Sequence, residues 1–416
     1  MDSAQAERLA ARSHLQSRGW IPRRSEAFHH LPPPALEHWL GEPGDSACAA
    51  PPLEGAGWTL HPLGSHGASG VDARWLDALD PTQRKALWAG LPAPGEGAAA
   101  PFAWAHRALC RQGLRLRIAA TPGKEGETVW LELRHQPRAQ AEAPLLVLDV
   151  EPGVRCVLIE THERSDGACG HPVAQNLHVH LRLAAGAHLQ HLRLALPGAQ
   201  DQTAHHLHAT LAAGAHYAQA LVAAGGGYHL QRHDVHLLGA GAQAQHAALL
   251  LTDGQRLDHQ VYTQIQAPGC HSGVETLALA QGPAHAVANA HTRIAPGADE
   301  AQVRQRLTGI PLAGQPRLVL RPHLEILHDQ VQAAHGATWG ALPEEALFYA
   351  RQRGLDEASA RALIVEGMAR ALLERCLEPA GSSGLLAQWL EGGWLARTLA
   401  RCLPAPAAGH LPAPQA

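Results

Sequence analysis

The sequence has 416 residues, with 33 basic and 37 acidic side chains that give a formal net charge of −4 at pH 7. A chain of this length can bury a large core and form two or three domains. Its nearly balanced charge gives no electrostatic footprint for nucleic acid or an anionic membrane, so neither is expected as a partner. No apolar stretch reaches the roughly 18 residues of a membrane span, and the polar N-terminus lacks the apolar region of a secretory signal.

The seven cysteines are scattered along the chain, and none forms a C-x-x-C pair. This pattern is typical of a protein kept reduced in the cytoplasm, and it argues against a disulfide framework or a zinc site. Thirty histidines invite a metal hypothesis. Lysine and asparagine are scarce while Ala, Gly, Pro and Arg abound, so most of the histidines are interpreted as compositional bias.

Residues 1–113 are predicted to form an N-terminal helical region with flexible linkers. Helical patterns cover residues 4–17, 34–40, 74–89 and 103–111. Runs rich in Pro, Gly and Ala at residues 41–57 and 91–101 interrupt them, and such runs are typical of flexible linkers.

Residues 114–341 carry an internal repeat. A glycine after a short β-type run recurs every 27 or 28 residues, and a second glycine follows each one 12 or 13 residues later; the first series is Gly186, Gly214, Gly241, Gly269 and Gly297, and the second is Gly198, Gly226, Gly254, Gly282 and Gly309. Glycine turns a corner with φ > 0 without a steric penalty, and apolar and polar residues alternate between the corners. This pattern predicts a mainly β protein whose core is a right-handed parallel β-helix, a β-solenoid, flanked by N-terminal and C-terminal helical domains. A β-sandwich with coincidental glycine spacing is the alternative.

Residues 342–403 are predicted to form a C-terminal helical domain. Asp356 is placed to cap a helix that ends near Leu377. Its apolar face is predicted from helical spacing, and its outer face carries two i,i+4 ion pairs, Glu357–Arg361 and Glu366–Arg370; the predicted face comprises Ala358, Ala362, Val365, Ala369, Leu372 and Cys376. A second amphipathic segment over 385–399 carries two tryptophans, which fit either a core or a partner groove. The tail at 404–416 is predicted to be disordered.

Searches for enzymatic motifs find little, so no catalytic residue is predicted. A pectin-lyase-like β-helix enzyme needs clustered carboxylates, and the acidic residues of the β zone do not recur at the repeat spacing. The sequence contains no G-x-S-x-G motif, no zincin motif and no complete phosphate-binding loop. The best candidate ligand cluster is at the end of the β zone: His323, Glu325, His328, Asp329 and His335. The pair His178 and His180 could chelate a metal but is expected to face solvent.

The stretch from Arg321 to Gly354, RPHLEILHDQVQAAHGATWGALPEEALFYARQRG, is the most specific motif of the chain. It resembles the hallmark segment of the SufB/SufD family, which reads roughly P-x-L-E-I-x-x-D-D-V-x-x-S-H-G-A-T-x-G and then L-F-Y-x-x-x-R-G. The resemblance covers the last third well and the β zone more weakly. The chain's length, and a helical region that leads directly into the β zone, are similar to the SufD branch of this family.

The resemblance implies a scaffold subunit for iron–sulfur cluster assembly that pairs with a SufB-like sister and binds a SufC-like ABC ATPase through residues 342–403. It implies that His335 binds metal as a ligand of a nascent iron–sulfur cluster that is shared with SufB. No cluster is expected to be held stably by this chain alone. The expected partner-facing residues are His335, Gly336, Thr338, Trp339, Phe348, Tyr349, Arg353 and Gly354. The isolated chain could also pair with itself.

One departure from the family pattern bears on this chemistry. Many members carry a cysteine two residues before the histidine, where this chain has Ala333. Ala333 cannot bind iron, so any thiolate must come from the partner. The hypotheses therefore stand as an assembly scaffold, a β-helix carbohydrate enzyme, or a structural adaptor that only anchors the ATPase.

Overall fold

The computed structural model describes residues 2–41, 57–63, 70–120, 123, 126–137, 139–164, 171–377 and 392–404. Most of the predicted linker at 41–57, the first part of the second amphipathic segment and the predicted disordered tail from residue 405 onward lie outside these residues.

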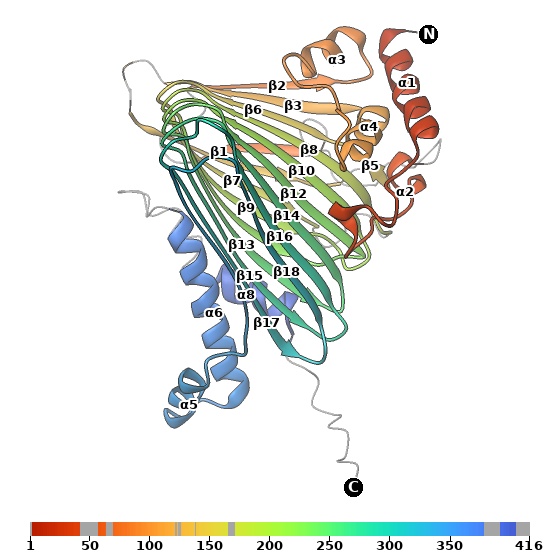
Figure 1. The fold of residues 1–416 in the computed structure, drawn as a ribbon. Coiled ribbons are helices and arrows are strands. Elements are labelled where there is room, and N and C mark those ends of the chain that lie inside the picture. Colours follow the sequence, from red (N-terminus) through yellow and green to blue (C-terminus); the bar gives the residue numbers. More distant parts are fainter. Residues whose placement is uncertain are drawn as a thin grey trace.

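The central part of the chain winds into a parallel β-solenoid of about eight turns, as the glycine repeat predicts (Figure 1). Each turn contributes one strand to each of two facing sheets. In chain order, the nine-stranded sheet contains β1 (Trp58–Pro62), β4 (Thr128–His135), β7 (Arg155–Glu163), β9 (His188–Leu196), β11 (His216–Ala224), β13 (Gln243–Asp253), β15 (His271–Gln281), β17 (Ala301–Ala313) and β19 (Val331–Trp339).

The ten-stranded sheet faces it across the interior. In chain order it contains β2 (Val71–Asp77), β3 (Gln112–Ile118), β6 (Leu145–Val150), β8 (Ala174–Leu183), β10 (Gln202–Leu211), β12 (Tyr228–Leu237), β14 (Arg256–Ile265), β16 (His285–Ile294) and β18 (Arg317–Ile326), with the short β5 (Ala141–Glu142) beside β8. The main hydrophobic core fills the space between the sheets along one side of the solenoid.

The glycine corners explain the regular winding. All five glycines of the first series have φ between 62° and 80°, a conformation that side chains rarely adopt. Corners of successive turns also bond to one another, since the Gly186 N–H donates to Ala213 O at 2.9 Å and the Gly214 N–H donates to Ala240 O at 2.9 Å. The second series is less uniform, because Gly254 and Gly282 have positive φ while Gly309 lies inside β17.

The N-terminal end of the solenoid is closed by two strands that the sequence analysis missed. β1 pairs antiparallel with β4, and β2 pairs antiparallel with β3. The predicted helix over 74–89 is therefore wrong in its first half: the chain is extended to Asp77, and α3 (Pro81–Leu87) begins only after the Asp80 cap. Pairing with a distant strand outweighs the local helical pattern.

The remaining N-terminal helices cover the outer face of the ten-stranded sheet (Figure 1). They are α1 (Ser3–Arg18), the 3-10 turn η1 (Glu26–Phe28), α2 (Glu37–Leu40) and α4 (Ala100–Leu109). Phe102 of α4 is fully buried and packs with Trp39, Phe28 and the outward-facing Tyr228 of β12. These helices therefore shield one face of the sheet from water.

The C-terminal helices are α5 (Glu344–Gln352), α6 (Glu357–Cys376) and α8 (Trp394–Cys402). α6 and α8 pack against the outer face of the nine-stranded sheet, and α5 extends away from it (Figure 1). The Asp356 cap is confirmed, since its carboxylate accepts from the Ser359 N–H at 2.7 Å.

The predicted face of α6 is confirmed over its last three turns. Val365, Ala369 and Leu372 are buried against the sheet, and the two predicted ion pairs form at 3.1 Å and 3.5 Å. The first two turns differ: Ala358 and Ala362 are exposed. None of the described helices is both long enough and apolar enough to span a bilayer.

Candidate functional site

The two ends of the solenoid differ in how their last strands are covered. At the C-terminal end, β18 and β19 are the final strands of the two sheets, and no further described strand pairs with either of them. Exposed strand edges present unpaired N–H and C=O groups that can template pairing with another chain. This open end is therefore the first candidate for a functional surface.

The two open edges are not equivalent. β18 carries Arg317, Arg321, Pro322 and Glu325, the charges and proline that natural proteins use to blunt an edge. β19, with the sequence VQAAHGATW, carries no formally charged side chain and no proline. The edge of β19 is thus the one open to strand addition.

His335 lies in the middle of β19 and is exposed. In the register of the sheet it stands opposite Gln305 of β17, and Ala333 stands opposite Val303. Gln305 and Val303 are buried inside the solenoid, so His335 lies on the interior-facing line of residues, at the mouth of the open end. The imidazole is neither packed inside the chain nor remote from the edge.

The other members of the predicted ligand cluster lie elsewhere. His323 and Glu325 are on β18 in the opposite sheet, where Glu325 pairs with Arg293 at 3.2 Å. His328 lies with Asp329 in the turn between β18 and β19, and it pairs with Asp299 of the preceding coil. Among the described residues, His335 does not join two other histidine, cysteine or carboxylate groups in a cluster tight enough for a metal ion.

Large exposed aromatic side chains gather at the end of β19 and in the helix α5 that follows it. Trp339 is 65% exposed at the end of β19, and Phe348 and Tyr349 of α5 are 64% and 58% exposed. The Arg353 guanidinium covers the Tyr349 ring at 3.6 Å from its centroid, and Gly354 ends this turn with φ 89°. Exposed aromatic groups of this size are typical of interaction surfaces.

The glycine after His335 has no role in the chain's own packing. A Cβ at Gly336 would meet no heavy atom within 4 Å, and the φ of Gly336 does not require glycine. Gly336 therefore suits a close approach by a group from outside the chain. Thr338 is exposed on the same strand.

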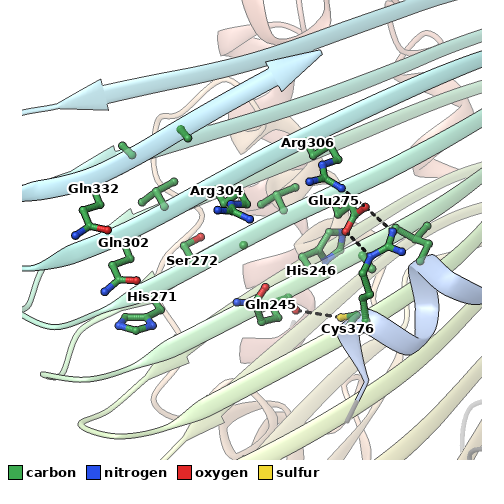
Figure 2. A pocket seen from close by; sticks show the side chains of 18 of the residues that line it. Gln245, His246, His271, Ser272, Glu275, Gln302, Arg304, Arg306, Gln332 and Cys376 are labelled. Atoms are coloured by element: carbon green, nitrogen blue, oxygen red, sulfur yellow. Dashed lines mark hydrogen bonds and ion pairs between the residues drawn. The ribbon is translucent and has the colours of Figure 1, made fainter. Parts of the chain in front are cut away.

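A groove of about 770 Å³ lies beside this edge, on the outer face of the nine-stranded sheet. Its floor is formed by β13, β15, β17 and β19, and its wall by α6. Figure 2 shows Gln332, Gln302 and His271 toward one end and Glu275 and Cys376 near the helix at the other. Glu275 pairs with Arg375 at 2.6 Å and with Arg306 at 3.6 Å, so the helix is fixed to the sheet by charge as well as by packing.

The described cysteines are held as thiols. Burial raises the pKa of Cys110 and Cys376 to about 12, and it raises the pKa of Cys156, Cys270 and Cys402 above the ordinary range. The thiolate is the metal ligand and nucleophile, so these groups are poorly poised to bind iron.

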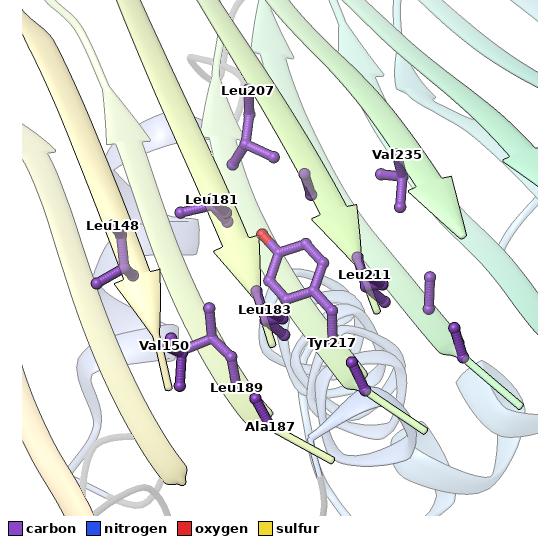
Figure 3. Close-up of a cluster of buried hydrophobic side chains, with 14 of the residues drawn as sticks. Leu148, Val150, Leu181, Leu183, Ala187, Leu189, Leu207, Leu211, Tyr217 and Val235 are labelled. Carbon is purple, nitrogen blue, oxygen red and sulfur yellow. The ribbon is translucent and has the colours of Figure 1, made fainter. Parts of the chain in front are cut away.

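The interior of the solenoid has an apolar side and a polar side. Figure 3 shows the apolar side, where Leu148, Leu181, Leu207 and Val235 project inward from successive strands of one sheet. On the polar side, the described residues include inward-facing histidines and glutamines and the ion pair of Glu160 with Arg193. This polar interior was missed in the sequence because both faces of these strands carry polar residues.

One buried ion pair lies at the centre of the polar side. Arg193 Nε donates to Glu160 Oε2 at 3.1 Å, and both side chains are fully buried. Burial alone would raise the pKa of Glu160, but Arg193 and the hydrogen bonds of the site outweigh it and hold that pKa well below its usual range. Burial lowers the pKa of His162 and His191 beside this carboxylate, so these imidazoles stay neutral.

The structure brings histidines together in two groups; the first adds His208 to the pair His178 and His180 that the sequence analysis named, and the second was not predicted. One is His178, His180 and His208 on the outer face of the ten-stranded sheet, and the other is His233, His246 and His259 in the interior. The expectation that His178 faces solvent is wrong, because α4 covers it and its ring lies 4.4 Å from that of His106.

Comparison with known proteins identifies the core of the chain. The family model described as "SUF system FeS cluster assembly, SufBD core domain" matches residues 133–368, which is more than half of the chain. The match runs from β4 to the middle of α6 and so contains the open end, His335 and the exposed aromatic groups.

Curated relatives carry the same description. An iron–sulfur cluster assembly SufBD family protein of Mycobacterium tuberculosis is 33% identical over 153 residues, 34% of this chain and 38% of the relative. The chain thus covers less than two fifths of that relative's length. The iron–sulfur cluster assembly protein SufD of Escherichia coli is 37% identical over 76 residues, 18% of each chain. A SufBD family protein of Synechocystis is 30% identical over 92 residues, 22% of this chain and 20% of the relative.

Proposed function

Because the chain belongs to the SufBD family of the SUF system for iron–sulfur cluster assembly, we propose that it acts there as a SufD-type, non-catalytic scaffold subunit. It pairs with a SufB-like sister subunit through the open end of the solenoid, and it holds a SufC-like ABC ATPase through its C-terminal helices. The complex works in the cytoplasm, in agreement with the free thiols of the five described cysteines.

The single observation that carries the pairing is the uncharged, uncovered edge of β19. Main-chain hydrogen bonds to a sister strand would satisfy the outward N–H and C=O groups of β19, and the partner would cover Trp339. The charged residues and proline of β18 disfavour the same pairing on the other sheet. In the absence of the sister, two copies of β19 could pair with each other, so the isolated chain is expected to be able to self-associate.

His335 is the group that this subunit contributes to the shared seam. Its imidazole faces the mouth of the solenoid, where an approaching subunit would enclose it. An iron–sulfur cluster needs about four ligands, and β19 offers one exposed imidazole, with no ready thiolate among the described residues. The nascent cluster, the cargo of the complex, is therefore held jointly, with thiolates from the sister, and no cluster is held stably by this chain alone.

The ATPase site is proposed on α5 and the start of α6. This part of the chain projects beyond the sheet and exposes Phe348, Tyr349 and Leu363. A partner that buries these side chains would transmit its motion through α6, which is fixed to the nine-stranded sheet beside the open end. This connection supports a role in which nucleotide-driven movement of the ATPase would reach the seam that contains His335.

Replacing His335 tests the proposal. The chain is co-expressed with the SufB and SufC subunits of the same organism, and the purified complex is assayed for cluster formation by visible absorption and iron content. His335→Ala is expected to leave the fold and both partners' binding unchanged and to abolish cluster formation. His323→Ala is the matched control, since His323 is also exposed on an edge strand, and it is expected to retain normal yield.

Normal cluster yield from His335→Ala would reject the ligand role and leave a structural adaptor. Loss of partner binding from the same variant would show that His335 supports assembly of the complex and not the cluster.

A further inference from the structure

The interior histidines form a site that neither the family description nor the proposed seam explains. His233 of β12, His246 of β13 and His259 of β14 are 0%, 7% and 1% exposed. They come from three consecutive strands, with spacings of 13 residues that are close to half of the 27- and 28-residue coil. Half a coil carries the chain from one sheet to the other, so this spacing brings the three rings together across the interior.

The rings are close enough to share one ion. Their candidate ligand atoms all lie within 4.8 Å of one another, and His246 Nε2 lies 2.9 Å from His259 Nε2. Zinc–nitrogen bonds of about 2.0–2.1 Å at the tetrahedral angle place ligand nitrogens roughly 3.3 Å apart. Small side-chain adjustments would bring this pair to that spacing.

A hydrogen bond between His246 and His259 accounts for only part of the cluster. Within the described structure, both nitrogens of His233 and the Nδ1 of His259 are buried without a hydrogen-bond partner. Buried polar groups are nearly always paired, and a group without a protein partner points to a missing water or ion. His233 faces the other two imidazoles, with ring centroids at 4.7 Å from His246 and 5.7 Å from His259.

The protonation of the three rings suits metal binding. Burial lowers the pKa of His233 and His246 well below the usual range and that of His259 to about 3, so all three are neutral and offer lone pairs at pH 7. Apolar residues close the cluster on the side of the open end: Val261, Val274, Ala290 and Leu307. The cluster is therefore separate from His335.

We propose that His233, His246 and His259 bind one first-row divalent transition-metal ion, for which Zn²⁺ is the best-suited candidate, inside the solenoid. Three neutral imidazoles are a common ligand set for this ion, with a water in the fourth position. Because the cluster is buried, the ion enters as the coils close during folding. Its effect is to join the two sheets at β12, β13 and β14.

Metal content of the full-length chain tests the site. The protein is expressed without a histidine tag in medium supplemented with Zn²⁺ or Co²⁺, passed over a desalting column, and measured by elemental analysis and, for Co²⁺, by visible ligand-field absorption. The wild type is expected to keep one ion per chain, with absorption of a nitrogen-rich, low-symmetry site. His233→Leu is expected to lose the ion and the absorption.

Two controls separate this site from its alternatives. The double variant H180Q/H208Q removes two of the three histidines of the outer group and is expected to keep the ion. His233→Leu also removes an unpartnered polar group, so its metal-free melting temperature is expected to match or exceed that of the metal-free wild type, while the shift upward with Zn²⁺ is lost. A wild type with no more metal than His233→Leu, or an ion lost only in H180Q/H208Q, would overturn the proposal.

Discussion

The two ends of the solenoid are built from similar parallel coils but are finished differently. At the N-terminal end, β1 and β2 turn back to cover each sheet with an antiparallel strand, and Trp58 of β1 is fully buried in the core beneath them. At the C-terminal end, β19 is a nine-residue edge, and its Trp339 is 65% exposed. One end is complete within the chain, and the other has the features of a surface that is completed by a partner.

The interior follows the same division. Inward-facing histidines run from His135 of β4 to His259 of β14. Beyond β14, the described inward positions hold no histidine until His335 at the mouth. Sensitivity to acid is therefore expected in the capped part of the solenoid, and sensitivity to partners at the open end.

The largest expected effect on stability is at the capped end. Trp58→Ala removes a fully buried side chain whose ring lies 4.6 Å from that of His135, and it is expected to lower the free energy of unfolding by about 3–5 kcal/mol. Chemical denaturation of the isolated chain measures this loss. A change below about 1 kcal/mol would show that β1 is not an integral part of the fold.

The second-largest effect is expected from acid, which should destabilise the capped part of the solenoid. In the metal-free chain, burial lowers the folded pKa of His259 to about 3 and of His229 to about 4, whereas the unfolded imidazoles titrate near 6.5. As the pH falls, the unfolded chain thus binds more protons than the folded chain does. The stability contribution is complete above pH 6.5 and decreases by about 1.4 kcal/mol per pH unit for each such histidine down to its folded pKa.

Hydrogen exchange at pH 7 and pH 5 locates this loss. Amides of β8 to β14 are expected to lose protection before those of β15 to β19. In the last coils the comparable groups are His285 and His291, which are on the outer face and partly exposed, so solvent screens their contribution. Loss of amide protection at the same pH along the whole solenoid would contradict the division into a histidine-rich capped part and an open end.

The matched change at the open end is expected to leave the isolated chain unaffected. Trp339→Ala removes a mostly exposed ring, so the free energy of unfolding should change by less than about 0.5 kcal/mol. Binding to the SufB-like sister should weaken by about 2 kcal/mol or more if this ring is an anchor of the interface. Titration calorimetry with the sister measures the second effect, and unchanged affinity would place Trp339 outside the interface.

The smallest effect on binding to the sister is expected from the removal of a single backbone N–H group on β19. The Gly340 N–H donates to Gly309 O of β17, so by strand alternation the N–H of Ala337 points away from β17. Ala337→Pro removes that donor without removing a bond of the chain itself, and it is expected to weaken sister binding by about 1 kcal/mol. Thr338→Pro is the control, since its N–H faces β17 and its loss should destabilise the isolated chain.

The regular part of the fold could be predicted from sequence. The glycine series fixes the corners because each has positive φ, and Asp356 marks the start of α6 because its carboxylate caps the first turn. β1 and β2 were missed because their pairing joins distant segments, which leaves no local period. His178 was misjudged because its cover, α4, comes from another part of the chain.

The candidate site was only partly accessible to the same reasoning. His335 follows from the motif, and its place at the open end follows from the end of the repeat. The interior cluster could have been found from histidines spaced by half a coil, as at His233, His246 and His259. That signal requires knowledge of which strand face points inward, and polar residues on both faces conceal it.

The most direct measurement of the central claim is hydrogen exchange at β19 with and without the sister subunit. In the isolated chain, the outward-facing amides of Ala333, His335 and Ala337 are expected to exchange rapidly, and in the complex they should become protected while β1 and β2 remain unchanged. A complex that forms while these three amides still exchange at the isolated rate would show that the open end is not where the subunits pair.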